Sequence, residues 1–83
     1  MTNRNQIWLK IELAVRADKR NKCFPYHATA KAGKVTAAAG KLMESCLEFK
    51  YSDENSNEVQ IKRMEDEAVN VAVQALRFLE NLK

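Results

Sequence analysis

The chain has 83 residues, of which 46% are hydrophobic and 30% are charged, with a formal net charge of +3. This length predicts one domain covering residues 1–83, and the composition is that of a globular protein rather than a disordered or fibrous one. No apolar run approaches the length of a membrane span, and the first ten residues, MTNRNQIWLK, lack the apolar core of a signal peptide. We therefore expect a cytoplasmic protein that does not enter membranes.

The charge is unevenly distributed along the chain. Residues 1–34 contain eight basic and two acidic side chains, whereas residues 35–83 contain six basic and nine acidic ones. A basic half is compatible with an anionic partner such as a phosphate compound or nucleic acid. The more ordinary interpretation is a solvated helix surface, and on charge alone we favour it.

The cysteines are few and far apart. Cys23 and Cys46 form no CxxC motif, and His27 is the only histidine. This pattern argues against a disulfide scaffold or a zinc site. Cys46 falls on an apolar stripe, so we expect it to be a small core residue.

The first predicted helix covers residues 3–19. Asn3 and Gln6 have the spacing of a capping box at its start. Apolar residues, among them Ile7 and Ile11, follow at helical spacing, which predicts a largely buried helix. Trp8 belongs to this set, and we expect it to be a core aromatic residue.

The second predicted helix covers residues 28–51 and follows the connection KRNKCFPY, in which Pro25 interrupts the helical pattern. Gly33 and Gly40 mark either a close contact or tolerated surface positions. Apolar residues at alternating steps of four and three predict a packing seam. The predicted seam consists of Ala28, Ala32, Val35, Ala39, Leu42, Cys46 and Phe49.

The third predicted helix covers residues 57–82 and follows the polar turn SDENSN, where Asn55 and Glu58 form a second candidate capping box. Its main apolar stripe is Ile61, Met64, Ala68, Val71, Ala75, Phe78 and Leu82, and a second stripe is Val69, Val73 and Leu76. The opposite, polar side is expected to hold Arg63, Asp66, Glu67, Asn70, Gln74 and Arg77.

Three helices with short connections predict an all-α fold, an antiparallel three-helix bundle. The second apolar stripe of the third helix exceeds what one short chain readily covers. We therefore expect the bundle to assemble as a homodimer or a higher oligomer such as a tetramer.

Two acidic segments are candidates for chemistry: ESCLE at residues 44–48 and DEAVN at residues 66–70. They lie on either side of one turn between antiparallel helices, at similar predicted heights. Carboxylates that converge from two helices can hold a divalent ion. From spacing alone, a solvated face with i,i+4 ion pairs is the favoured interpretation.

The segments GKLMESCLEFKY and EDEAVNVAVQALRFLENL resemble the MazG-like, all-α nucleoside triphosphate pyrophosphohydrolases. That family has a K-L-x-E-E-x-x-E helix followed by an E-E-x-x-D helix. The resemblance covers roughly residues 40–82. It implies hydrolysis of a nucleotide triphosphate to the monophosphate and pyrophosphate, with Mg²⁺ or Mn²⁺ held by acidic residues, and assembly as a dimer or tetramer.

The resemblance assigns roles to particular residues. It implies catalytic roles for Glu44, Glu48 and Glu67, contact with substrate for Lys41, and metal ligation by Glu48, Glu67, Asn70 and Asp66. Ser45 and Asn70 stand where the family has acidic ligands. Because both lower the negative charge that attracts Mg²⁺, weak hydrolysis or nucleotide binding alone is expected.

Two alternatives remain open at this point. One is a helical interaction module on the same fold without catalysis. The other is a nucleic-acid-binding protein, which is less favoured because the aromatic and basic residues do not interleave.

Overall fold

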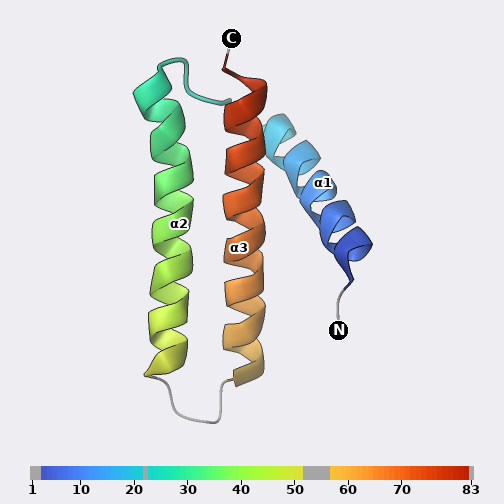
Figure 1. Ribbon diagram of the computed structural model, residues 1–83, viewed down its shortest axis with the longest axis vertical. Coiled ribbons are helices and arrows are strands. Elements are labelled where there is room, and N and C mark those ends of the chain that lie inside the picture. The colour runs from blue at the N-terminus through green and yellow to red at the C-terminus, as the bar shows by residue number, and fades with distance from the viewer. Residues whose placement is uncertain (1–2, 22, 52–56, 83) are drawn as a thin grey trace.

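The computed structural model describes residues 3–21, 23–51 and 57–82, which form three helices: α1 (Arg4–Asn21), α2 (Ala28–Lys50) and α3 (Asn57–Glu80) (Figure 1). No strand is present in these three ranges. The all-α prediction is confirmed, and the predicted helix boundaries differ from those observed by at most two residues. None of these helices combines the length and apolarity needed to cross a bilayer.

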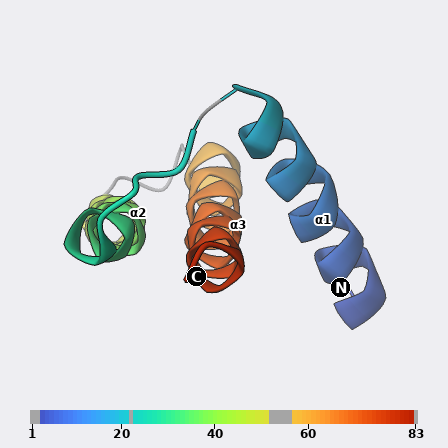
Figure 2. The ribbon, with the colours of Figure 1, turned by 90° about the horizontal axis from the view of Figure 1, so that it is seen from above.

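α3 lies between the other two helices (Figures 1 and 2). It contacts both α1 and α2, and no backbone contact joins α1 to α2 among the described residues. α2 runs antiparallel to both neighbours, so the chain goes up, down and up. The three helices of the bundle therefore lie nearly in one layer and not at the corners of a triangle. α3 has its two helical neighbours on nearly opposite sides.

The helix starts agree with local sequence signals. The backbone N–H of Asn3 donates to Gln6 Oε1 at 3.2 Å, and the Gln6 N–H donates to Asn3 Oδ1 at 2.9 Å. This reciprocal pair confirms the first capping box. His27 is the N-cap of α2, without a side-chain cap bond. The second candidate box involves Asn55, which lies outside the described residues.

The core between α1 and α3 is built from Ile11, Val15 and Val73, with partly buried neighbours around them. Those neighbours are Ala14, Val69, Ala72 and Leu76. The second apolar stripe of α3 is thus covered by α1 of the same chain. The expectation that this stripe is left for a second copy was wrong, because α1 crosses α3 on the side that α2 leaves open.

An ion pair and a hydrogen bond join α2 to α3 and to the residue that follows it. Arg63 binds Glu48 near one end, and Lys31 donates to the main-chain oxygen of Asn81 at the other. The apolar seam residues of α3 are Met64, Val71 and Phe78, and all three are half-buried. They alternate with polar residues that are also spaced by seven. The polar positions are Gln60, Glu67 and Gln74, and Asn81 continues the same spacing directly after the helix.

The seam of α2 agrees with the predicted one at Val35, Leu42 and Phe49, which are half-buried, and differs from it at the positions between them. Ala38 and Ser45 are buried at 3% and 1% exposure, whereas Ala39 and Cys46 are exposed. The expectation of a core Cys46 was therefore wrong. The cause is the width of the apolar face: with Ala at both 38 and 39, either residue can pack in the seam, and a small rotation of the helix favours Ala38.

Several other expected core residues face solvent. Trp8 is 52% exposed, and Ile61 and Leu82 are 50% and 55% exposed. α1 touches only α3, so only a narrow stripe of α1 is covered and Trp8 lies at its edge. The prediction that Trp8 is a core aromatic was wrong for this reason.

Gly33 and Gly40 are surface positions. A Cβ added at either would meet no heavy atom within 4 Å. Of the two interpretations left open by the sequence, tolerated surface glycines are the one observed, and neither glycine marks a close approach of helices.

Candidate functional site

A cavity of about 120 Å³ lies where the C-terminal end of α1 meets the flank of α2 and α3. It is lined by Asp18, Cys23, Phe24, Lys34, Ala37, Ala38, Lys41, Asn70, Gln74 and Arg77. We call it the cationic pocket, because its lining contains three basic side chains and one acidic side chain. All three helices and the connection before α2 contribute to it.

The repeat of seven residues explains why these side chains meet. Lys34 and Lys41 are two helical turns apart on α2, and Asn70 and Arg77 have the same spacing on α3. Residues spaced by seven lie on nearly the same side of an α-helix. Each pair therefore follows one flank of the α2–α3 seam, and the antiparallel register brings the two flanks together.

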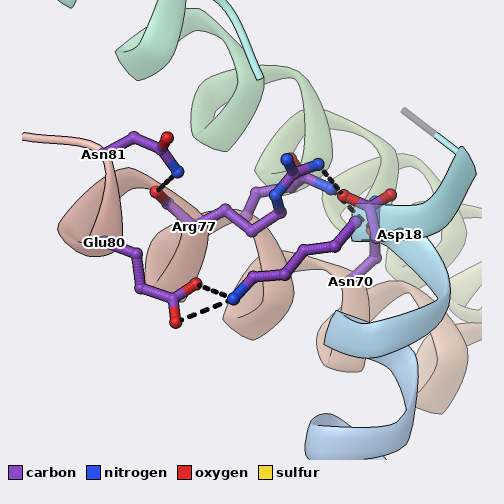
Figure 3. A network of polar contacts seen from close by, with 7 residues as sticks. Asp18, Asn70, Arg77, Glu80 and Asn81 are labelled. Atoms are coloured by element: carbon purple, nitrogen blue, oxygen red, sulfur yellow. Dashed lines mark hydrogen bonds and ion pairs between the residues drawn. The ribbon is translucent and has the colours of Figure 1, made fainter. Parts of the chain in front are cut away.

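Arg77 forms the fixed side of the pocket. Its Nη1 donates to Asp18 Oδ2 at 2.7 Å, and both side chains are almost inaccessible (Figure 3). The guanidinium also lies over the Phe24 ring, 5.0 Å from the centroid. The Arg77 carbonyl accepts a 2.7 Å bond from Asn81 Nδ2. A guanidinium held on several sides keeps its orientation, which favours recognition of a planar or tetrahedral anion.

The two amide side chains of the pocket are also ordered by contact with each other. Gln74 Nε2 donates to Asn70 Oδ1 at 3.2 Å, and Gln74 is 8% exposed. This leaves the NH₂ group of Asn70 as a further donor at the edge of the cavity. Lys34 and Lys41 are exposed, so their ammonium groups can move toward a ligand.

The residues predicted for the site lie at several places along α2 and α3. Lys41 and Asn70 both line the cationic pocket. Glu48 lies two turns farther along α2, where Arg63 binds its carboxylate. Glu67 is half-buried at a seam position, and Glu44 is on the exposed surface of α2.

Asp66, the remaining predicted ligand, faces α1. Lys10 Nζ lies 3.4 Å from Asp66 Oδ1 and 3.2 Å from Glu65 Oε1, and Lys62 Nζ lies 3.3 Å from Asp66 Oδ1. Desolvation is the largest single effect on the Asp66 carboxyl and raises its pKa, but Lys62 and Lys10 together outweigh it and the pKa is lowered. The hydrogen bond to Glu65 is the main cause of a raised pKa at Lys10. These carboxylates therefore tie α1 to α3.

The described residues include no group of three or more His, Cys, Asp and Glu side chains that could hold a metal ion. Ser45, which occupies an acidic position of the family motif, is 1% exposed, and its hydroxyl donates to the Leu42 carbonyl at 2.8 Å. An ion bound by Glu48 would have to compete with Arg63.

Sequence reasoning did not identify Asp18, Lys34 or Arg77 as site residues. The spacing of seven that joins Lys34 to Lys41, and Asn70 to Arg77, is readable from the sequence. The contribution of Asp18 is not, because it is 59 residues away from Arg77.

Comparisons with protein-family models, with curated proteins and with solved structures gave no match.

Proposed function

We propose that this protein binds the phosphate groups of a nucleoside triphosphate in the cationic pocket, and that it releases pyrophosphate from the nucleotide slowly or not at all. The observation that supports this proposal is that Lys41 and Asn70 line one cavity with Lys34 and Arg77. Lys41 and Asn70 are also positions matched to the MazG-like motifs. The proposal thus rests on that resemblance and on the charge of the pocket.

The size of the cavity indicates which part of the ligand it would hold. A volume of about 120 Å³ suits phosphate groups, whereas sites that enclose a whole drug-sized ligand measure roughly 300–1,000 Å³. The nucleoside would therefore lie outside the cavity. Lys34 and Lys41 would neutralise phosphate charge, and Arg77 would orient one phosphate group through its fixed guanidinium.

Slow hydrolysis is expected because two of the acidic residues are paired with basic side chains and a third ligand position has a neutral side chain. A bound Mg²⁺ neutralises phosphate oxygens and activates water in reactions of this class. By the resemblance, Glu48, Glu67 and Asn70 would hold the ion, with Asp66 in support. Glu48 and Asp66 are each bound by basic side chains, and Asn70 offers only a neutral oxygen. Binding without efficient turnover follows from these contacts.

The first experiment is calorimetric titration with a panel of nucleoside triphosphates, with and without Mg²⁺. Lys41→Glu should weaken nucleotide binding at least tenfold. The matched control is Lys50→Glu, which makes the same charge change on α2 away from the pocket and should alter binding less than twofold. No binding at millimolar nucleotide, or equal losses in the two variants, would contradict the proposal.

Hydrolysis is tested separately, by release of pyrophosphate. Asn70→Asp keeps an oxygen acceptor for Gln74 and adds a carboxylate at the pocket edge. If the resemblance extends to catalysis, this variant should bind Mg²⁺ more tightly and release pyrophosphate faster than the wild type. Nucleotide binding with no pyrophosphate release by either the wild type or this variant would leave a binding protein and exclude the hydrolase.

A further inference from the structure

A second hollow lies beside the cationic pocket, at the end of the molecule where α2 begins and α3 ends (Figure 1). It is a groove of about 440 Å³, and we call it the aromatic groove. The residues that line it include Phe24, Pro25, Tyr26, Lys31, Asn81 and Leu82. Phe24 also lines the cationic pocket, so the two hollows meet at this side chain.

Tyr26 presents an open ring at the aromatic groove. It is 89% exposed, more than any other large hydrophobic side chain of the described residues. The His27 ring meets it edge to face, with the ring centroids 5.6 Å apart, and such a contact covers at most one face of the Tyr26 ring. Pro25 fixes its own φ and restricts Phe24, so the backbone between the two aromatic residues has little freedom. An open aromatic face at a constrained position can stack on the flat face of a nucleobase.

Hydrogen bonds connect the aromatic groove to the arginine of the cationic pocket. Lys31 donates to the main-chain oxygen of Asn81, and Asn81 Nδ2 donates to the Arg77 carbonyl at 2.7 Å (Figure 3). The guanidinium of Arg77 in turn lies over the Phe24 ring. The groove and the pocket are therefore parts of one set of ordered side chains.

The two hollows are close enough for one nucleotide to occupy both. Lys31 lines the groove and Lys34 lines the pocket, and three residues of an α-helix rise about 4.5 Å. An extended nucleoside triphosphate is longer than this rise, so its base can reach the groove while its phosphates lie in the pocket. The described residues that line the groove include no acidic side chain, so none of them repels the phosphate chain.

We propose that the aromatic groove holds the base of the nucleotide whose phosphates occupy the cationic pocket, with Tyr26 stacked on the base. Leu82, which is 55% exposed, adds apolar surface on the side of α3. This inference rests on the proposed phosphate site. It adds a reason for the protein to select a nucleotide over an inorganic phosphate compound, because phosphate groups gain nothing from aromatic and apolar surface.

Calorimetric titration with two probes, ATP and inorganic tripolyphosphate, tests this inference. Tripolyphosphate has the same chain of three phosphate groups and at least as much negative charge, so tighter binding of ATP measures the contribution of the nucleoside. Tyr26→Ala should weaken ATP binding about tenfold, as expected when a ring that stacks on a base is removed, and should leave tripolyphosphate binding unchanged. Tyr26→Phe keeps the ring and should bind both probes as the wild type does.

Tyr51→Ala is the matched control for the loss of a tyrosine ring. Tyr51 is also well exposed, at 76%, but it is the C-cap at the far end of α2. This variant should bind each probe within about twofold of the wild type. Circular dichroism should show the same helix content in all three variants, because both tyrosines lie on the surface.

Proton NMR supplies a second readout that does not depend on affinity alone. The ring current of adenine should shift the ring signals of Tyr26 when ATP is added, and tripolyphosphate should leave these signals in place. The signals are identified by their loss in Tyr26→Ala. Equal affinity of the wild type for the two probes, or equal losses of ATP binding in Tyr26→Ala and Tyr51→Ala, would overturn this inference and leave the phosphate site standing. No binding of either probe would overturn the proposed function together with this inference.

Discussion

Arg77 of α3 and Asp18 of α1 form an ion pair of 2.7 Å in which the two side chains are only 7% and 13% exposed. The other ion pairs of the described residues are considerably more exposed. This pair joins the end of α1 to the middle helix (Figure 3). Both residues also line the cationic pocket. It therefore connects the stability of the fold to the shape of the candidate site.

Removal of Asp18 should be strongly destabilising. Asp18→Ala leaves a buried guanidinium without its carboxylate, and breaking a buried pair in this way costs about 3–5 kcal/mol. The free energy of unfolding, measured by urea titration followed by circular dichroism, should fall by about that amount. Glu12→Ala is the control on the same helix: Glu12 forms an exposed pair with Arg16 at 3.8 Å, worth at most about 0.5 kcal/mol. Equal losses of unfolding free energy in the two variants would show that the buried pair stabilises the fold no more than the exposed pair does.

The glycines of α2 should be replaceable with a gain in stability. Gly33→Ala and Gly40→Ala should each raise the free energy of unfolding by about 0.5–1 kcal/mol, because alanine loses less backbone entropy on helix formation and meets no neighbour. Thermal unfolding of each variant measures the effect. Ala30→Gly, at an exposed position of the same helix, should lower stability by a similar amount. A loss of stability in the two alanine variants would contradict the open surroundings that the structure gives these positions.

The contact between Lys10 and its two acidic partners should make stability depend on pH. The folded pKa of Asp66 is lowered from 3.8, so its contribution is present above that value and is lost as the pH falls through the folded pKa. The folded pKa of Lys10 is raised from 10.5, so its contribution is present below that value and is lost as the pH rises through the raised pKa. Asp66→Asn should therefore reduce the acid-side fall in thermal stability.

Ionic strength supplies the control for this pH effect. The side chains of Lys10 and Asp66 are well exposed, so added salt should screen their attraction. The difference between wild type and Asp66→Asn should shrink as salt rises from 0.05 to about 1 M. An acid-side profile that the substitution leaves unchanged would locate the titrating groups elsewhere.

Ser45→Glu should destabilise the protein instead of restoring a metal site. Ser45 is 1% exposed, so a glutamate there would bury a carboxylate in the α2–α3 seam at a cost of several kcal/mol. Leu47→Glu, on the exposed side of the same helix, should cost less than about 1 kcal/mol. Chemical unfolding compares the two. A stable Ser45→Glu variant that binds Mg²⁺ would instead support a site at the predicted ligand positions.

The site was only partly predictable from the sequence. The motif resemblance selected Lys41 and Asn70, and the structure places both in one cavity. The same resemblance selected Asp66, which faces α1 and pairs with Lys10. Spacing along a helix shows which residues share a side, but it does not show which neighbour covers that side. The structure shows that Arg63 binds Glu48 and that Lys10 and Lys62 bind Asp66, which the motifs alone did not indicate.

The sequence by itself determined the three helices and their ends. Helical spacing, the Asn3–Gln6 capping box and the interruption at Pro25 act within a few residues, so local physics decides them.

The tertiary structure alone decided how each helix is rotated and which helices touch. It selected Ala38 over Ala39 for burial, set α1 against α3 alone, and buried Arg77 beside Asp18. An alanine-rich helix has several apolar sides, and burying any of them releases a similar free energy. A buried arginine is stable only where a carboxylate from another part of the chain lies beside it. Both outcomes depend on contacts between segments distant in sequence, which a local pattern does not encode.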